Sequence, residues 1–412
     1  MKNWKKEKLG DVCNFVRGPF GGSLKKNIFK EDGYAVYEQQ HAIYNQFDSI
    51  RYFIDENKFN EMKRFELNSG DLIMSCSGTM GKIAIVPENI KKGIINQALL
   101  KLSPSKKIST IFLKLWMQSE SFQDSLKEYS GGAAIQNVAS VAILKKIEIP
   151  LPSLEEQLLI VAILDEAFAA IGKAKTNAEQ NLKNSKELFE SYLQNVFAAK
   201  GKGWEEKMLK EIGTAQTGTT PKTADKENYG DFIPFIKPAD IDIKGNGEIR
   251  YDNEGLSEQG LRNGRKMLEG SILMVCIGAT IGKLGFVNRD VSCNQQINSL
   301  TVKQEFSPKF IYYALSTKDF FEKIMHNSSQ ATLPIINKGK WETLTVSFPK
   351  SKLEQETIVQ KLDALSAETK KLEAIYQQKI NDLEELKKSV LQKAFSGELT
   401  LASSVLKKEV IL

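Results

Sequence analysis

Histidine, cysteine and proline are scarce in this chain, whose 412 residues include 2 His, 4 Cys and 11 Pro. The cysteines lie far apart and form no Cys-x-x-Cys pair, so we expect no metal site. Cys76 and Cys276 fall inside apolar runs, where small buried side chains are expected. With so few histidines a hydrolytic triad has little support. The composition therefore argues against metal-dependent and triad-based catalysis.

Long hydrophobic runs are also missing. No apolar stretch approaches the roughly 18 residues that span a bilayer. The charged residues at the start are not followed by the apolar stretch of a signal peptide. We therefore expect a cytoplasmic protein without membrane contact. A composition of 41% apolar and 26% charged residues is typical of globular proteins, and the length suits two or three domains.

The most informative feature that is present is an internal repeat. Trp4-Lys5-Lys6-Glu7-Lys8-Leu9 returns as Trp204-Glu205-Glu206-Lys207-Met208-Leu209, and residues 70–76 return as 270–276, both at an offset of 200. Further matches at offsets of 198 to 201 join Gly81-Lys82 to Gly282-Lys283, Asn96-Gln97 to Asn294-Gln295, Glu156-Gln157 to Glu354-Gln355, and 193–197 to 391–395. Solenoid repeats are only about 20 to 50 residues long. The period indicates a duplicated domain with its linker and a pseudo-twofold arrangement.

Each copy begins with a segment of mixed pattern. Strand-like apolar runs bounded by Gly, Asn and Pro lie at 34–37, 72–74, 82–86 and 147–150, and again at 233–236, 272–275, 283–287 and 344–349. Between them we expect one helix from Ser109 to Tyr129, and its counterpart near Pro308 to Ile324. The pattern predicts two tandem α+β domains, at residues 1–152 (the first head) and 201–350 (the second head).

Each copy ends in a helical segment, 153–200 and 351–400, which leaves 401–412 as a tail. Apolar positions step by threes and fours along the first segment, and most return 198 residues later, from Ile358 to Ala394. In the first segment these positions are Ile160, Leu164, Ala167, Ile171, Ala174, Ala178, Leu182, Ser185, Leu188, Tyr192 and Val196. A helix of about 43 residues is roughly 65 Å long. A 150-residue domain is only about 30 to 35 Å across. We therefore expect the two helices to form an intramolecular antiparallel coiled coil that separates the heads; the alternative is that each helix lies on its own head.

The positive charge lies in the heads. Residues 1–150 hold 22 Lys and Arg against 16 Asp and Glu, and residues 201–350 hold 20 against 18. The segments 151–200 and 351–412 hold 5 against 7 and 10 against 10. This distribution is a weak indication of a polyanionic ligand, and an ordinary mildly basic surface is the alternative.

Three motifs carry a resemblance to a known family. They are the duplicated hairpin Gly70-Asp71-Leu72-Ile73-Met74 with Gly81-Lys82-Ile83-Ala84, the helix entry at 150–165, and the closing residues 391–400. In this order, and twice, they resemble the specificity subunit of type I restriction-modification enzymes. The resemblance covers essentially the whole chain, although 348–352 and the tail after Thr400 depart from the family pattern. It implies a non-catalytic protein whose two target-recognition domains read the halves of an asymmetric, bipartite site in double-stranded DNA. It also implies two methyltransferase subunits as partners, with restriction subunits added secondarily.

Direct readout of DNA needs amides, guanidinium groups and hydroxyls on loops, with lysines for phosphates. The candidates in the first head are Arg17, Lys25, Lys26, Gln39, Gln40, His41, Ser77, Thr79, Lys82, Asn96, Gln97, Gln136 and Asn137. The candidates in the second head are Thr219, Thr220, Lys222, Lys237, Asp240, Thr280, Lys283, Asn294, Gln295, Gln296, Gln330 and Thr332. The Gly-Lys and Asn-Gln pairs recur in both heads, so a shared framework role or a backbone contact suits them better than sequence discrimination.

The sequence also offers two alternative functions. The segments 77–83 and 277–284 resemble a phosphate-binding loop, but Cys76 and Ile277 occupy its first glycine position, and Ile83 and Leu284 its Ser or Thr position. A tight turn in a hairpin explains these glycines better, and we expect no cofactor. The remaining alternative is a coiled-coil scaffold that joins protein partners without touching DNA.

Overall fold

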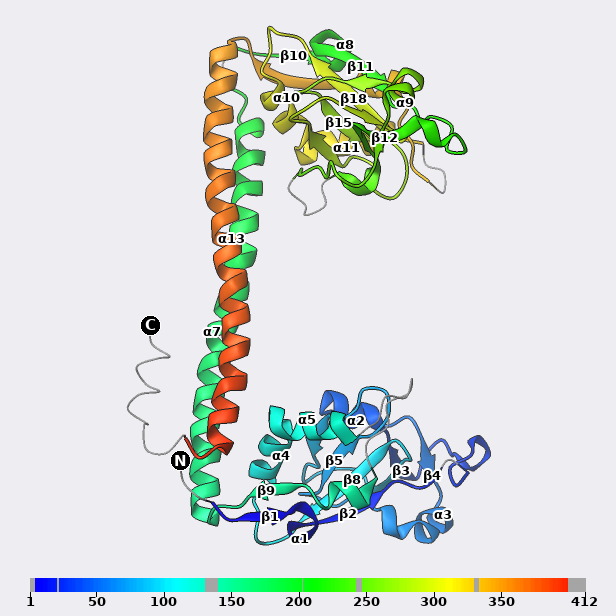
Figure 1. The fold of residues 1–412 in the computed structure, drawn as a ribbon, viewed down its shortest axis with the longest axis vertical. Coiled ribbons are helices and arrows are strands. Elements are labelled where there is room, and N and C mark those ends of the chain that lie inside the picture. Colours follow the sequence, from blue (N-terminus) through cyan, green and yellow to red (C-terminus); the bar gives the residue numbers. More distant parts are fainter. Residues whose placement is uncertain are drawn as a thin grey trace. The chain divides into compact units, whose positions relative to one another are not determined.

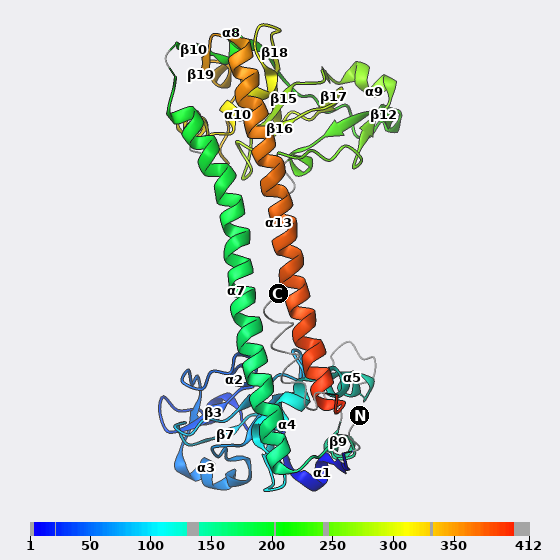
Figure 2. The same cartoon turned by 90° about the vertical axis from the view of Figure 1, so that its left-hand side faces the viewer.

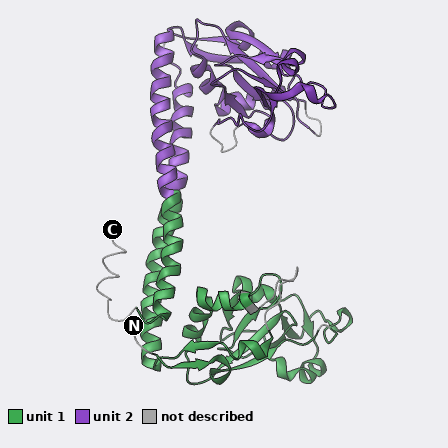
Figure 3. Ribbon diagram, in the orientation of Figure 1, with its two compact units in different colours: residues 1–179, 377–412 green, residues 180–376 purple. Residues whose placement is uncertain are grey.

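The computed structural model describes residues 4–20, 22–129, 140–201, 203–241, 247–329 and 333–398. The chain divides into two compact units (Figure 3). The first unit joins Met1–Glu179 to Gln377–Leu412, and the second is Gln180–Tyr376. Each unit contains one head and a part of each long helix, α7 (Leu154–Ala198) and α13 (Lys352–Phe395) (Figure 1). The predicted fold class, two α+β heads with two long helices, is confirmed.

The first head contains a four-stranded antiparallel sheet of order β2-β8-β5-β6. Its strands are β2 (Cys13–Arg17), β5 (Leu72–Ser75), β6 (Ile83–Ile85) and β8 (Leu99–Pro104). The second sheet has the order β4-β3-β7, in which β3 and β7 are parallel. Its strands are β3 (Tyr34–Tyr37), β4 (Phe53–Ile54) and β7 (Gly93–Ile95). A two-stranded ladder of β1 (Lys6–Lys8) and β9 (Glu148–Pro150) leads into α7.

The second head repeats this plan. Its first sheet has the order β11-β18-β15-β16, with β11 (Gly213–Thr217), β15 (Ile272–Val275), β16 (Leu284–Phe286) and β18 (Ile297–Val302). Its second sheet has the order β13-β12-β17-β14, with β12 (Tyr229–Ile236), β13 (Gly255–Leu256), β14 (Lys266–Met267) and β17 (Val291–Cys293). The ladder of β10 (Trp204–Met208) and β19 (Thr345–Pro349) leads into α13. The duplicated sequence therefore folds as a duplicated architecture.

The alternation of side chains along β5 explains why the head has two cores. All four residues of β5 are buried. Leu72 and Met74 belong to a core that includes α4 (Thr110–Gln118) and α5 (Glu120–Tyr129), whereas Ile73 belongs to a core shared with the second sheet. Successive residues of a strand point to opposite faces, so one strand serves both cores. In β15 the same alternation separates Ile272 and Met274 from Leu273 and Val275.

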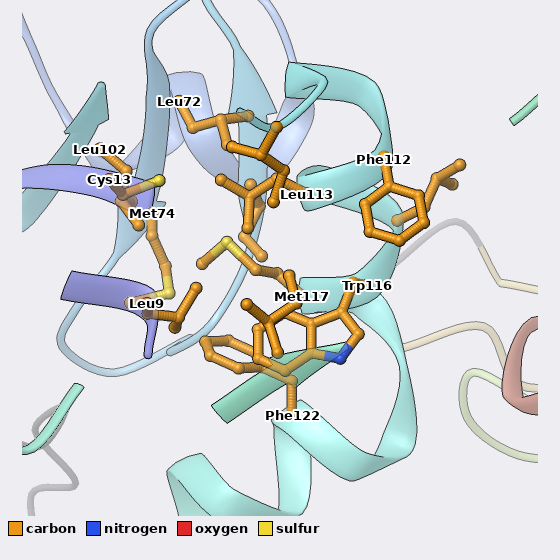
Figure 4. Packing of buried hydrophobic residues seen from close by; sticks show 14 of the residues in the cluster. Leu9, Cys13, Leu72, Met74, Leu102, Phe112, Leu113, Trp116, Met117 and Phe122 are labelled. Atoms are coloured by element: carbon orange, nitrogen blue, oxygen red, sulfur yellow. The ribbon is translucent and has the colours of Figure 1, made fainter. Parts of the chain in front are cut away.

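Figure 4 shows the first of these cores, where α4 and α5 meet the strands. Phe112, Trp116 and Met117 of α4 are each at most 3% exposed, and the rings of Trp116 and Phe122 lie 5.0 Å apart. A buried side chain of this size contributes about 1.5–3 kcal/mol relative to an exposed one. This core fixes α4 and α5 against the sheet.

The predicted single helices at 109–129 and 308–324 are wrong in one respect, because each is broken into two. In the first head Ser119 separates α4 from α5: its backbone is extended (φ −68°, ψ 153°) and its hydroxyl donates to the Trp116 carbonyl at 2.6 Å. In the second head Ser316 and Thr317 separate α10 (Pro308–Leu315) from α11 (Lys318–Asn327). Serine and threonine side chains compete with the helix for backbone groups, so they favour helix ends.

In each unit α7 and α13 lie side by side and run antiparallel (Figure 2). In the first unit Lys175 Nζ and Glu384 Oε1 are 2.6 Å apart, and Ile160 and Leu164 share a core with Ala394. In the second unit Leu193 packs with Leu362 and Tyr313, and the Tyr313 hydroxyl donates to Asp363 Oδ1 at 2.5 Å. The predicted pairing of the helices is confirmed, and each helix pair also packs on the head of its unit.

A buried glutamine anchors each helix to its head. Gln157, which is 0% exposed, accepts a hydrogen bond from the Ser109 amide (2.8 Å) and donates to the carbonyls of Lys107 (3.1 Å) and Pro152 (3.0 Å). Gln355, 1% exposed, accepts from the Ser307 amide (2.8 Å) and donates to a carbonyl at the end of β19 (2.8 Å). The repeated Glu-Gln motif is thus a link between the start of the long helix and the start of α4 or α10.

Candidate nucleic-acid interface

Strand ends and loops converge at one place in the first head, which we call its strand-end junction (Gly18, Cys76 and 96–98). The amide of Gly18, directly after β2, donates to the first residue of β8 at 2.9 Å. The amide of Asn96 donates to the last residue of β3 at 2.9 Å, and that of Cys76 to Ala98 at 2.9 Å. A side chain at Gly18 would place its Cβ 1.8 Å from the Asn96 carbonyl oxygen, so only glycine fits.

The second head has a matching strand-end junction (Gly218, Cys276 and 294–296). The amide of Gly218 donates to the first residue of β18 at 2.9 Å, that of Asn294 to the last residue of β12 at 3.1 Å, and that of Cys276 to Gln296 at 2.8 Å. A Cβ on Gly218 would lie 2.2 Å from the Asn294 carbonyl oxygen. Residues 198 to 200 positions apart therefore form the same hydrogen bonds.

Two predicted DNA contacts have structural roles within these frameworks. The side chain of Asn96 accepts from the Ala98 amide (3.0 Å), and that of Asn294, 8% exposed, accepts from the Gln296 amide (3.1 Å). Each asparagine thereby stabilises its own turn, as asparagine commonly does. This agrees with a shared framework role for the recurring Asn-Gln pair.

His41 and Asp240 also occupy matching positions and are both 1% exposed. His41 Nδ1 accepts from the Glu38 amide at 2.8 Å, and its Nε2 lies 3.1 Å from the Ser49 carbonyl oxygen. Asp240 accepts from the Lys237 amide (2.9 Å) and from the Asn253 side chain (3.0 Å). Each side chain caps the turn that follows a strand end. Their polar atoms are used inside the protein, so these two residues support the junction in place of the base contact predicted for them.

The remaining candidates around the first junction are more accessible. Ser77 Oγ donates to Gln39 Oε1 at 3.1 Å, which joins the hairpin 76–82 to the start of α2 (Gln39–Tyr44). Gln40, Thr79, Lys82 and Gln97 are exposed, whereas Gln39, Ser77 and Arg17 are half-buried. Arg17 ends β2, and its guanidinium group lies near the Cys76 thiol. The structure thus brings three separate candidate loops together.

The second junction presents different side chains. Thr220 Oγ1 donates to Gln295 Oε1 at 2.5 Å, and Lys237 Nζ donates to Glu254 Oε2 at 2.5 Å. Thr280 is exposed and Lys283 is half-buried on the hairpin 277–283, and Thr219 and Gln296 are half-buried. Donors and acceptors therefore surround both junctions, but their identities differ.

Lysines flank the junctions. Lys25 and Lys26 are exposed at the start of a short 3₁₀ helix (Lys26–Ile28), and Lys222 is exposed directly after Pro221. Five lysines form no ion pair with any residue that the structure describes, namely Lys25, Lys26, Lys82, Lys222 and Lys283. Four further candidates, Gln136, Asn137, Gln330 and Thr332, lie outside the described residues.

The thiols are not activated for chemistry. Burial raises the pKa of Cys13 and Cys293 to about 12 and that of Cys276 to about 11. Burial likewise raises the pKa of Cys76 to about 12, and the nearby Arg17 guanidinium opposes only part of that rise. Reactive cysteines have lowered pKa values instead. Within the described ranges, no three His, Cys, Asp or Glu side chains are grouped to hold a metal ion, and no helix combines the length and hydrophobicity to cross a bilayer.

Two structural features were missed by the sequence reasoning. The repeat predicts a match between the two Glu-Gln motifs, but it does not by itself predict that Gln157 and Gln355 anchor the helices. The recurrence of this motif at the start of both long helices was the available signal. Phe20 was passed over although it lies in the Gly-rich loop between the candidates Arg17 and Lys25, and it is 90% exposed. An aromatic residue surrounded by glycines was the signal there.

Comparisons with known proteins agree with this duplicated plan. The chain belongs to the family of the type I restriction modification DNA specificity domain, whose model matches residues 1–181 and again 201–385. Its role is accordingly DNA sequence specificity within a type I restriction-modification system.

Individual relatives extend the likeness. The specificity subunit of the type I restriction enzyme StySPI from Salmonella potsdam is 24% identical over 432 residues, which cover 97% of this chain and 90% of that protein. The HindI specificity subunit from Haemophilus influenzae is 28% identical over 153 residues, a match spanning 37% of this chain and only 33% of that relative. A chain in a solved structure of a type I R-M system is 20% identical, with a TM-score of 0.76 over 96% of this chain and 98% of its own. At that identity the structural likeness shows the fold alone.

Proposed function

We propose that this chain is the non-catalytic reader of its restriction-modification enzyme, and that each head reads one half of an asymmetric, bipartite site in double-stranded DNA. One observation carries the proposal: the two heads share a strand-end junction but surround it with different side chains. Gln39 and Ser77 flank the first junction, whereas Thr220 and Lys237 flank the second. Because base edges are read by donors and acceptors, unlike sets favour unlike half-sites.

The lysines support phosphate contacts. Lys25, Lys26 and Lys82 in the first head, and Lys222 and Lys283 in the second, lack an ion-pair partner among the described residues. A lysine without a protein counter-charge can neutralise a phosphate, and phosphate contacts position a protein without reading sequence. We therefore assign these lysines to orientation on the duplex and the amides and hydroxyls to readout.

The helices suit partner docking. In the first unit Leu158 and Leu159 are 60% and 58% exposed on α7, and in the second unit Leu353 and Ile375 are 74% and 58% exposed on α13. Clusters of exposed apolar side chains favour contact with another protein. The presence of such residues in both units supports two methyltransferase subunits as partners, with restriction subunits joining secondarily.

The proposed division of labour follows the boundaries expected from the sequence. Residues 1–152 and 201–350 read DNA, whereas 153–200 and 351–400 set the gap between the half-sites and bind partners. No role is assigned to 401–412.

The salt dependence of DNA binding tests this proposal against a scaffold that does not touch DNA. If the five lysines each displace a counterion, log Kd against log salt changes with a slope of about 4.5, or roughly 500-fold between 50 and 200 mM salt. The assay uses the full chain assembled with its methyltransferase partner and a duplex carrying the site. A slope near zero would contradict the reader and favour the scaffold.

A further inference from the structure

Phe20 is an exposed aromatic residue at the edge of the first junction. Its side chain is 90% exposed, the highest value among the large apolar residues that the structure describes. Burying a phenylalanine side chain stabilises a protein by about 1.5–3 kcal/mol. Because the Phe20 ring is exposed, it provides little of that stabilisation. Single exposed apolar residues are common on protein surfaces. The surroundings of Phe20, rather than its exposure alone, indicate a role.

The backbone around Phe20 is anchored on both sides. On one side Gly18 is hydrogen-bonded to β8 and pressed against Asn96, and Pro19 is buried. On the other side Leu24 packs against the core formed by Val36, Ile54, Phe59, Met62 and Ile94. The Ser23 amide donates to the Phe20 carbonyl at 2.9 Å. Described residues on both sides of Phe20 are therefore hydrogen-bonded or packed, whereas its own side chain is exposed.

The neighbours of Phe20 have the chemistry of a DNA surface. Lys25 and Lys26 follow it in the same loop, exposed and without ion pairs to described residues. On the other side, a Cβ at Gly18 would lie 3.1 Å from the Cα of Gln97, whose amide is exposed. Along the chain, Phe20 thus stands between a glycine that packs on Gln97 and two exposed lysines without described ion pairs.

The second head lacks this aromatic residue at the matching position. Thr219 and Thr220 follow Gly218, and both are hydrogen-bonded within the head. The Thr219 amide donates to the Cys293 carbonyl (2.9 Å), and the Thr220 hydroxyl donates to Gln295 (2.5 Å). The next residue, Pro221, is buried. The same loop therefore carries a protruding ring in one head and a tethered hydroxyl in the other.

We propose that Phe20 is a wedge that inserts between two neighbouring base pairs of the half-site bound by the first head, unstacks them and kinks the duplex. The inference rests on the proposed function and adds an activity to it, the distortion of one half-site only. Inserted apolar side chains unstack base steps in this way, and aromatic rings stack on bases of any sequence. Pyrimidine–purine steps are the easiest to unstack. Phe20 would therefore favour such a step without a hydrogen bond to it.

Permanganate footprinting tests the wedge, because permanganate oxidises unstacked thymines and every pyrimidine–purine step of the TA or CA/TG type contains one. The probe is a duplex carrying the site that methylation sequencing identifies, bound by the full chain with its methyltransferase partner. The variants are Phe20→Ala, Phe20→Trp and, as a matched control, Tyr44→Ala, which removes another exposed aromatic side chain (69%) of the same head. Equal thermal stability of all variants confirms that folding is intact.

We expect thymines in one half-site to react with the wild type and with Phe20→Trp, and the same thymines to be protected with Phe20→Ala. Phe20→Ala should also bind about tenfold or more weakly, as expected for the loss of one aromatic–base stack. Tyr44→Ala should match the wild type. Unchanged reactivity and affinity in Phe20→Ala would overturn the wedge while leaving the reader intact. Absence of salt-dependent binding by the wild type would instead overturn the proposed function.

Discussion

Replacing Gln157 by leucine tests whether the buried glutamine anchors the first head to α7. The substitution keeps the side-chain volume similar but removes hydrogen bonds of 2.8, 3.1 and 3.0 Å from a side chain that is 0% exposed. It leaves the Ser109 amide and two carbonyls without partners. Each buried unsatisfied group costs about 1–3 kcal/mol. We therefore expect the free energy of opening at this contact to fall by about 3 kcal/mol or more.

Native-state hydrogen exchange on the full chain measures this loss locally. Peptides covering 105–118 should lose protection in Gln157→Leu, whereas peptides covering 303–316 should not, because Gln355 holds those. Gln355→Leu should give the reverse pattern. The matched control is Gln180→Leu, since Gln180 is an exposed glutamine of the same helix whose side chain, among the described residues, bonds only Asn184 (2.8 Å). It should stay within about 0.5 kcal/mol of the wild type.

The pH dependence of Gln157→Glu follows from the same contact. A glutamate can accept from the Ser109 amide but faces two carbonyl oxygens, and burial raises the pKa of a carboxyl group. Because the folded state would then hold a proton that the unfolded state releases, stability should fall as the pH rises from about 5 to 8.

If the head pivots on α7 once the anchor is lost, discrimination against duplexes with one extra base pair in the gap should also weaken. Equal exchange in Gln157→Leu and the wild type would refute the anchor.

Three further predictions concern the lysines, the helices and the thiols. Changing Lys25 and Lys26 to Glu should weaken DNA binding about equally on all sequences and leave the methylated motif unchanged, because phosphate contacts carry no sequence information; an altered motif would show base contact. Deleting 172–178 together with 377–383 removes about 10 Å of helix from each partner, so methylation sequencing should report a shorter gap between half-sites, and an unchanged gap would contradict the spacer. The four cysteines, with pKa values raised to about 11 or 12, should react with a thiol reagent at pH 8 only after unfolding. Since unfolded thiols ionise near pH 8.5, stability should fall as the pH rises above that value, which urea titrations from about pH 7 to 10 would measure; a flat profile would contradict burial of the thiols.

The long helices and several strands could be predicted because their patterns are local. The period of threes and fours in 154–196 and the apolar run of β5 are visible in neighbouring residues. Strand β18 was missed because its buried positions include Asn298 and Ser299, both 0% exposed, which hide the apolar alternation. The helix breaks at Ser119 and Thr317 depend on single side-chain hydrogen bonds to the preceding turn.

The candidate interface was predictable in part. Residue type and loop context pointed to Gln39, Ser77 and Gln97, but their proximity depends on the pairing of strands that are far apart in the sequence. The same limitation explains why His41 and Asp240 were chosen: a polar residue after a strand can read a ligand or cap a turn. Only the three-dimensional partners of the side chain distinguish these two roles.

Sequencing native DNA with detection of modified bases, in source cells with and without this gene, tests the central claim most directly. The account predicts a methylated motif with two unlike halves separated by a fixed gap, and loss of that motif when the gene is deleted. Restoring the gene should restore the motif. A motif that survives deletion of the gene would contradict the assignment of this chain as its reader.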